Sequence, residues 1–329
     1  MAKKTLLSGI TPSGSGNLHI GNYFGALKQW VDMQDTYNTF IFVADLHALT
    51  VIQDKEKLKS NIISVVLDYL GAGLDPEKIT LFKQSDVPAH TELAWTFNCI
   101  TTMAYLERAH AYKDAHMKAK EINVGLFDYP LLMAADILLY DPDVVPVGQD
   151  QKQHVEYARD TAQKFNHIFG ETFRLPEPMI IENVAVVPGT DGRKMSKSYG
   201  NTIPLFGTDD EIKKAVMSIV TDSKTPDEPK DPSTCNIFAL HKLFLSDNEL
   251  EALRNRYTQG GLGYKESKEM LLSEILRFVT PMRDRRDSYA KDIPKVLEIL
   301  KTGGIKARKI AEEKIKLVRN AQGVEIYDN

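Results

Sequence analysis

The sequence predicts an α/β protein: a Rossmann-like parallel sheet with helices on both faces, plus a smaller all-α C-terminal domain. Two observations carry this prediction. From residue 5 to about residue 185, short apolar runs alternate with segments of helical periodicity, the pattern of a parallel sheet covered on both faces. From about residue 208 to residue 300 the strand-like runs disappear and amphipathic helical patterns take their place.

Each element follows from its local pattern of apolar and turn residues. We expect strands at residues 5–10, at 38–50 where the strand runs into a loop, at 78–86, and at the start of 143–165. We expect helices at residues 21–34, 57–75, the remainder of 143–165, 209–222 and 265–290. Gly71 and Gly73 are expected to close the second of these helices.

The resulting organisation has four parts. We expect residues 1–186 to form the Rossmann-like domain, 187–205 a loop and hinge, 206–300 a helical domain, and 301–329 a basic helix that packs back toward the Rossmann-like domain. No apolar run is long enough for a membrane span and no secretory segment opens the chain, so we expect a cytoplasmic protein without a membrane partner. The two cysteines lie far apart, which argues against a disulfide framework or a thiolate metal site.

Two short motifs carry the chemistry. The first turn holds four glycines between Gly9 and Gly21, and its HIGN segment places His19 and Asn22 at the start of a helix, where backbone amides favour an anion. It matches neither GxxxxGK[ST] nor GxGxxG. The second, GRKMSKSYGN at residues 192–201, predicts a surface loop with two cations, Lys194 and Lys197. Alone, the first could be a helix cap and the second a solvated basic turn.

Together, HIGN and KMSKS in this order resemble the paired motifs of the class I aminoacyl-tRNA synthetases. Over nearly its full length the chain resembles the tryptophanyl-tRNA synthetases within that class, through segments such as DYPLLMAADILLY and VPVGQDQKQHVE. The resemblance implies ATP as a substrate with Mg²⁺, L-tryptophan and tRNA(Trp) as further partners, and a homodimer. It implies no DNA partner and no resident metal site.

The resemblance also implies the ATP site. His19, Asn22, Lys194 and Lys197 would be catalytic, with both lysines stabilising the charge on the leaving pyrophosphate. The remaining ATP contacts would come from Thr11, Pro12, Ser13, Gly21, Gly148, Gln149, Asp150, Val186, Met195, Ser196 and Ser198. The resemblance adds Lys113 as the best match for a lysine that would assist with the phosphates. Thr11 and Gln149 depart from the residues common in the family, glutamine and glutamate respectively, and the first loop is longer around Ser15–Gly16.

A predicted helix in DYPLLMAADILLY carries the tryptophan site. Tyr129, Met133 and Asp136 are spaced to share one helix face, and Pro130 suits the first turn of that helix. This face offers a hydroxyl, a polarizable apolar group and a carboxylate, while an indole needs an apolar slot and an acceptor for its single N–H. The resemblance assigns the acceptor role to Asp136, puts Tyr129 near the α-amino group, and adds Gln151 and His47 to the pocket.

The net charge of −4 gives no overall attraction for tRNA, but residues 301–319 hold seven basic residues against two acidic ones. Arg283, Arg285 and Arg286 could add phosphate contacts. The alternatives are a solvated helix face for this stretch and, for the whole chain, three other functions. These are a tyrosine-specific relative, a nucleotidylyltransferase without tRNA activity, and a catalytically silent RNA-binding or regulatory relative.

Overall fold

The computed structural model describes residues 3–12, 18–109, 112–113, 122–147, 152–180 and 187–326. The strands are β1 (Thr5–Ile10), β2 (Asn38–Val43), β3 (Ile79–Lys83), β4 (Val145–Val147) and β5 (Pro178–Ile180). The helices up to the middle of the chain are α1 (Ile20–Asn22), α2 (Lys28–Met33), α3 (Asp45–Ala48), α4 (Lys55–Ala72), α5 (Ala89–Ile100), α6 (Met103–Leu106), α8 (Val124–Leu138) and α9 (Lys152–Phe169). The later helices are α10 (Asp209–Met217), α11 (Asn236–His241), α12 (Asp247–Gln259), α13 (Tyr264–Ala290) and α14 (Ile293–Gln322).

Three shorter helical turns complete the described structure: a π-helical turn η1 (Tyr23–Leu27) and the 3₁₀ turns η2 (Gln84–Asp86) and η4 (Lys197–Tyr199). Throughout the described ranges, every helix is too short or too polar to cross a membrane.

The sheet is parallel, as the alternation of strand and helix patterns predicted. Strands β1, β2 and β3 lie in that order, with Ile41 of β2 opposite Ser8 of β1 and Leu81 of β3. A bridge between Leu6 and Val144 joins β1 to the segment that leads into β4, which pairs in parallel with β5. The predicted fold class is therefore confirmed.

Alternate residues of β2 explain why helices cover both faces. Ile41 and Val43 belong to the core beneath α4 and α13, whereas Phe40 and Phe42 belong to the core formed with α5, α8 and α9. Successive side chains of a strand point to opposite faces, so the unbroken apolar run from Phe40 to Val43 is buried on both sides of the sheet. This places β2 at the centre of the molecule.

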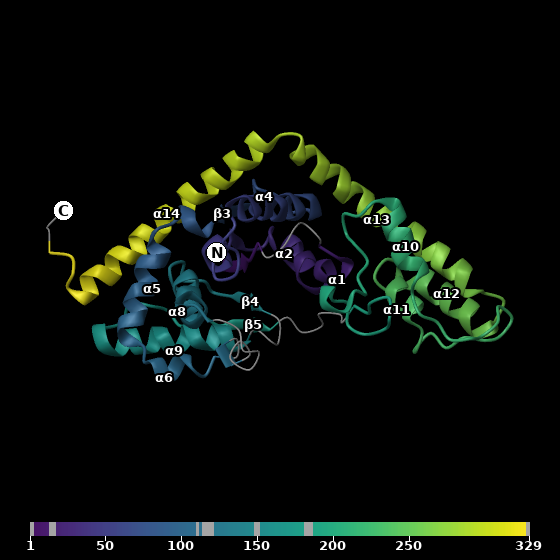
Figure 1. The fold of residues 1–329 in the computed structure, drawn as a ribbon, viewed down its shortest axis with the longest axis horizontal. Coiled ribbons are helices and arrows are strands. Elements are labelled where there is room, and N and C mark those ends of the chain that lie inside the picture. Colours follow the sequence, from purple (N-terminus) through teal and green to yellow (C-terminus); the bar gives the residue numbers. More distant parts are fainter. Residues whose placement is uncertain are drawn as a thin grey trace.

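Two long helices extend from this centre in opposite directions (Figure 1). Helix α13 packs along α4 and also packs against α10 and α11. The all-α part of the chain lies below α13 in this view. Helix α14 turns back over the sheet and packs on β3 and α5. The last two helices therefore brace the sheet and the all-α region together.

Arginines on α13 make this bracing specific. Arg286 forms an ion pair with the buried carboxylate of Asp68 on α4 at 2.6 Å, and Arg285 donates to the carbonyl of Gly71. Arg283 forms an ion pair with Asp209 at 2.6 Å. The three side chains that the sequence offered for tRNA phosphates are thus used to hold α13 against its own chain.

Helix α14 is fixed in a similar way. Arg308 donates to the carbonyl of Asp86, Lys314 pairs with Asp141 at 2.5 Å, and Arg319 pairs with Glu92 through two nitrogens at 2.6 Å each. Three of the seven basic residues in this stretch therefore bind the sheet domain. The helix is continuous from Ile293, so the expected boundary at residue 300 lies within it.

Three local expectations were wrong. Helix α4 continues through Gly71 and ends at Gly73, whose φ of 117° is left-handed, so Gly73 alone supplies the cap. The strand β2 leads into the short helix α3 rather than directly into a loop. Pro130 lies in the middle of α8, not in its first turn, because Asn123 caps the helix about two turns earlier by accepting from the amide of Leu126.

The close contact between α14 and β3 yields a stability prediction. A Cβ atom on Gly303 would overlap the carbonyl oxygen of Leu81. We expect Gly303→Ala to destabilise the fold by about 1–3 kcal/mol, the usual cost of overpacking. In an exposed helix the same change would stabilise by about 1 kcal/mol, so the sign is diagnostic. Urea unfolding of Gly303→Ala beside the exposed neighbour variant Thr302→Ala measures it, and a Gly303→Ala protein as stable as its parent contradicts the contact.

Candidate active site

The HIGN segment closes on itself as a helix cap. The imidazole Nδ1 of His19 accepts from the backbone N–H of Asn22 at 3.2 Å, and the Asn22 side-chain oxygen accepts from the backbone N–H of His19 at 3.1 Å. Both residues therefore serve the structural role that the motif alone allowed. Each still retains a donor: the Nε2–H of a neutral His19 and the side-chain amide of Asn22.

Backbone pairing joins this cap to the chain segment that follows the KMSKS loop. Ile20 donates its N–H to the carbonyl of Ile203 at 3.0 Å, and Leu205 donates to the carbonyl of Leu18 at 2.8 Å. Gly21 lies against Met195, and its N–H contacts the methionine sulfur at 3.3 Å. A side chain at Gly21 would crowd both His19 and Met195, so glycine permits the approach of the two motifs.

A buried asparagine organises the KMSKS loop. The side-chain oxygen of Asn201 accepts from the N–H of Ser196, and its amide donates to the Asp191 carboxylate and the Lys194 carbonyl. Asp191 also pairs with Arg193 at 2.6 Å. The loop backbone is thus held by its own side chains. Sequence reasoning missed Asn201, although the residue closes the motif.

The two lysines of the loop are exposed. Neither Lys194 nor Lys197 has an ion-pair partner among the side chains that the structure describes. Met195, between them, is buried against the HIGN helix, and Ser196 and Ser198 contact one another through their hydroxyls at 2.9 Å. The loop therefore anchors its methionine and leaves its cations available.

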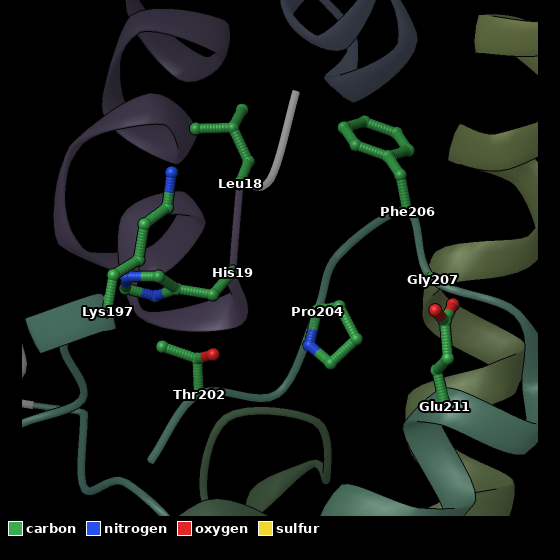
Figure 2. Close-up of a pocket in the computed structure, with 8 residues that line it drawn as sticks. All are labelled: Leu18, His19, Lys197, Thr202, Pro204, Phe206, Gly207 and Glu211. Atoms are coloured by element: carbon green, nitrogen blue, oxygen red, sulfur yellow. The ribbon is translucent and has the colours of Figure 1, made fainter. Parts of the chain in front are cut away.

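A pocket of about 460 Å³ lies where the two motifs meet (Figure 2). His19 and Lys197 line one side of it, and Phe206 and Glu211 line the side across from them. The remaining lining residues are Leu18, Thr202, Pro204 and Gly207. One side of this pocket presents hydrogen-bond donors and a cation, which suits an anionic group.

The electrostatics of the pocket keep His19 uncharged at neutral pH. Burial, with a smaller contribution from the charge of Lys197, lowers the pKa of His19 from 6.5 to about 4. Because Nδ1 accepts the Asn22 N–H, the single proton of the neutral ring lies on Nε2. His19 can therefore act as a neutral donor that its cap has fixed in one tautomer.

Other predicted ATP contacts fall in three groups. Thr11 is exposed, while Pro12 is buried and its carbonyl accepts from Asn61 at 3.1 Å. Lys113 is exposed within the short described stretch 112–113. Five predicted ATP contacts lie outside the described residues, namely Ser13, Gly148, Gln149, Asp150 and Val186, and so does Gln151 of the predicted tryptophan site.

A second cluster surrounds Asp136. Tyr129, Met133 and Asp136 all lie on α8, and the ring of His47 on α3 meets the ring of Tyr129 edge-on at 6.4 Å. The Asp136 carboxylate is 1% exposed and contacts Nε2 of His47 at 2.8 Å. The structure thus brings together the four described members of the predicted tryptophan group.

Two members of the cluster were absent from the prediction. Gln84 donates its side-chain amide to Asp136 at 2.7 Å, and His90 contacts the same carboxylate oxygen through Nδ1 at 2.6 Å. Burial would raise the pKa of Asp136, but the interactions with His90 and His47 outweigh burial and hold it at about 2. The carboxylate is therefore ionised, a pure acceptor in largely apolar surroundings.

A parallel sheet with a capped HIGN turn paired to a KMSKS loop defines a class I aminoacyl-tRNA synthetase. A model of the family described as tRNA synthetases class I (W and Y) matches residues 2–280. The chain belongs to this family.

Within the family, the chain is similar to several tryptophan enzymes. The tryptophan–tRNA ligase of Fusobacterium nucleatum is 52% identical over 322 residues, which cover 98% of each chain. That of Rhodopirellula baltica is 46% identical and covers 97% of this chain and 99% of its own. The crystal structure of tryptophanyl-tRNA synthetase from Campylobacter jejuni complexed with ADP and tryptophan superposes with a TM-score of 0.92, at 48% identity, and covers 97% of this chain and 99% of its own.

The cap geometry predicts an unusual titration for His19. Because folding holds its pKa below the unfolded value, its neutral form favours the folded state above about pH 6.5, and that contribution is lost as the pH falls through 4. NMR of the histidine rings, assigned with His19→Asn, should show an Nε2–H tautomer near pH 7. Lys197→Ala should raise the His19 pKa. A His19 that titrates near 6.5, or carries its proton on Nδ1, contradicts the cap.

Proposed function

We infer that this protein is a tryptophan–tRNA ligase: it activates L-tryptophan with ATP and transfers it to tRNA(Trp). The observation that carries this function is the backbone pairing of residues 18–20 with 203–205, which sets His19 and Lys197 beside one pocket. The curated relatives at up to 52% identity support the same activity. The tryptophan and ADP of the Campylobacter jejuni complex support the two small substrates.

Tryptophan is proposed to bind at the Asp136 cluster. The ionised carboxylate would accept the indole N–H, while Met133 and the ring of Tyr129 would provide apolar contact. His47 borders the same carboxylate, and Gln151 would reach the ammonium group. An acceptor with a fixed position in dry surroundings favours a ligand whose donor reaches it, because an unpaired buried carboxylate lone pair costs free energy.

ATP is proposed to bind with its phosphates between the two motifs. The Nε2–H of His19 and the side-chain amide of Asn22 would donate to phosphate oxygens, and Lys194 and Lys197 would supply positive charge. Mg²⁺ would enter with ATP as part of the substrate, held by phosphates and water as this ion prefers. Among the described residues no cluster of three His, Cys, Asp or Glu side chains could hold a metal ion, so no step is assigned to a protein-bound metal.

The reaction then needs positioning and charge stabilisation rather than a protein nucleophile. A carboxylate oxygen of tryptophan attacks the α-phosphorus of ATP, and the bond from that phosphorus to its bridging oxygen breaks. Pyrophosphate leaves with the electron pair, which gives tryptophanyl-adenylate. A ribose hydroxyl at the 3′ end of tRNA(Trp) next attacks the carbonyl carbon, loses its proton, and displaces AMP.

The proposed domain roles follow the four segments expected from the sequence. Residues 1–186 would carry out catalysis, and the loop in 187–205 would stabilise the charge on the leaving pyrophosphate. Residues 206–300 would contact tRNA, and 301–329 would pack back on the catalytic domain. Three exposed lysines of α14 remain available for tRNA phosphates after the internal contacts among the described residues are made: Lys306, Lys309 and Lys316. Since its substrate is tRNA, we place the protein in the cytoplasm.

We further propose a homodimer whose interface includes the outer surface of α5 and α6. Trp95 is 71% exposed there and Met103 is 68% exposed, both unusually high for large apolar side chains. Analytical ultracentrifugation should give twice the chain mass, and Trp95→Glu should shift the protein toward monomer. A monomeric parent, or an unchanged dimer in the variant, argues against this interface.

Amino-acid-dependent exchange between ATP and labelled pyrophosphate tests the proposed function. Each of the twenty amino acids is supplied in turn, and exchange with tryptophan alone is expected. Exchange with tyrosine would indicate the tyrosine-specific alternative. If none of the twenty amino acids supports exchange, the result would favour a nucleotidylyltransferase or a catalytically silent relative.

If Lys197 stabilises the charge on the leaving pyrophosphate, its loss should slow adenylate formation more than the later transfer to tRNA. Lys197→Ala should slow adenylate formation by about two to three orders of magnitude, the size typical of a preorganised charge-stabilising group. Tryptophan affinity and thermal stability should change little because the side chain is exposed. Single-turnover kinetics separate activation from transfer, and transfer of preformed adenylate should be less affected. Activation within a factor of three of the parent would make the loop an ordinary basic turn.

A further inference from the structure

The Asp136 carboxylate has an uneven distribution of hydrogen bonds. Its Oδ1 contacts Gln84 at 2.7 Å and His90 at 2.6 Å, while its Oδ2 contacts only His47, at 2.8 Å, among the described residues. A carboxylate oxygen offers about two lone-pair sites. Oδ1 is therefore fully used, and Oδ2 keeps one site for another donor.

His90 is the most enclosed of these partners. It lies in the first turn of α5 with 0% exposure, and its Nε2 contacts the hydroxyl of Tyr140 at 2.9 Å. Since a carboxylate only accepts, Nδ1 of His90 must carry a proton. Its Nε2 contacts the Tyr140 hydroxyl, as an acceptor if the ring carries one proton and as a donor if it carries two. Both ring nitrogens are thus committed, so His90 ties Asp136 of α8 to Tyr140, which lies just beyond the end of that helix.

Gln84 fixes the same oxygen from a different direction. Its side-chain oxygen accepts from the N–H groups of Leu46 and His47, so its amide nitrogen must face Asp136. This interaction spans from η2 to α3 and α8. Because Gln84 and His90 hold Oδ1 from separate elements, rotation of the carboxylate would break two hydrogen bonds together.

We propose that His90 is a positioning residue for tryptophan recognition: it keeps Asp136 ionised and oriented so that Oδ2 receives the indole N–H, without itself touching the substrate. The proposal rests on the proposed function. It adds a residue that neither the sequence motifs nor the pocket lining identified. His47, which is partly exposed, shares Oδ2 with the substrate, whereas His90 acts from the core.

The charge balance around Asp136 gives the proposal a distinctive consequence. The titratable groups that face the carboxylate are His47 from α3, His90 from α5 and Tyr140 beyond α8, while Gln84 from η2 is neutral. Burial alone raises the pKa of Asp136, so its low value depends on the histidines. Without His90 the carboxyl group should protonate at a higher pH. A protonated oxygen no longer accepts the indole N–H as well.

Three variants separate positioning from packing. His90→Phe removes both nitrogens but keeps a ring among the aromatic neighbours Phe42 and Phe82, whose centroids lie at 6.0 and 6.4 Å. His90→Asn keeps a donor close to the position of Nδ1. Tyr140→Phe removes only the hydroxyl beyond His90, so the contact with Asp136 stays. His47 is present in every variant, and its contact with Oδ2 is therefore common to all.

The readouts are the tryptophan dissociation constant by calorimetry, KM for tryptophan and for ATP, and the tryptophan-to-tyrosine ratio of kcat/KM. For His90→Phe we expect tryptophan binding about tenfold weaker or more at neutral pH, with KM for ATP nearly unchanged. The defect should grow as the pH falls from about 7 to about 5, while the parent changes less over that range. His90→Asn should recover most of the affinity, and Tyr140→Phe should change it by less than about threefold.

Two results would overturn the proposal. One is a His90→Phe protein whose tryptophan affinity and pH profile match the parent. The other is an equal loss of tryptophan and ATP affinity together with lower thermal stability in both His90→Phe and His90→Asn, which is the mark of a purely structural residue. Tryptophan-dependent exchange by the parent tests the proposed function separately. Suppose the parent shows tryptophan-dependent ATP–pyrophosphate exchange while His90→Phe keeps the parent's tryptophan affinity. That result contradicts only the positioning role of His90.

Discussion

Two backbone hydrogen bonds between residues 18–20 and 203–205 hold together the parts of the chain on which the site depends. Nearly two hundred residues separate these strands of chain, yet their pairing sets the HIGN cap against Met195 of the KMSKS loop. The pairing uses main-chain groups, so it leaves the side chains of His19 and Lys197 for the pocket. A single geometric constraint thereby places a neutral donor and a cation beside one pocket.

Helix α13, near the C-terminal end of the chain, supports the pairing of residues 18–20 with 203–205. Arg283 holds the segment just beyond the pairing through Gly207 and Asp209, and Arg286 lies over the ring of Phe206 while it pairs with Asp68. These contacts tie α13 to the wall of the pocket. A change in the position of the helical domain would therefore act on the pocket wall directly. Phe206 and Gly207 thus both line the pocket and contact α13.

The sequence predicted the sheet well because its signal is local. Apolar runs bounded by turn residues identified β1, β2 and β3. The change from strand-like runs to amphipathic helical patterns near residue 208 located the all-α region. Helix ends were less certain. Proline is favoured in the first turn of a helix and disfavoured in its interior, so Pro130 predicted a helix start, whereas the cap Asn123, seven residues earlier, sets the start of α8.

The site was predicted in part, and for a physical reason. Motif residues such as His19, Lys197 and Asp136 carry chemistry that their own types and spacing reveal. Gln84, His90 and Asn201 act by holding those residues, and only the folded chain shows which group each one contacts. A buried histidine and glutamine look like ordinary core polar residues in a sequence. The substrate roles of all these residues stay predictions.

Amide hydrogen exchange at Ile20 and Leu205 tests the central claim most directly, because these two N–H groups make the pairing. Exchange followed by NMR in the protein without substrates reports each amide separately. If the two motifs are joined as described, both amides should be protected to an extent comparable with that of Ile41 in the central strand. Exchange of either amide at the rate of an unstructured peptide would show that the motifs are not held together, and the account of the site would fail.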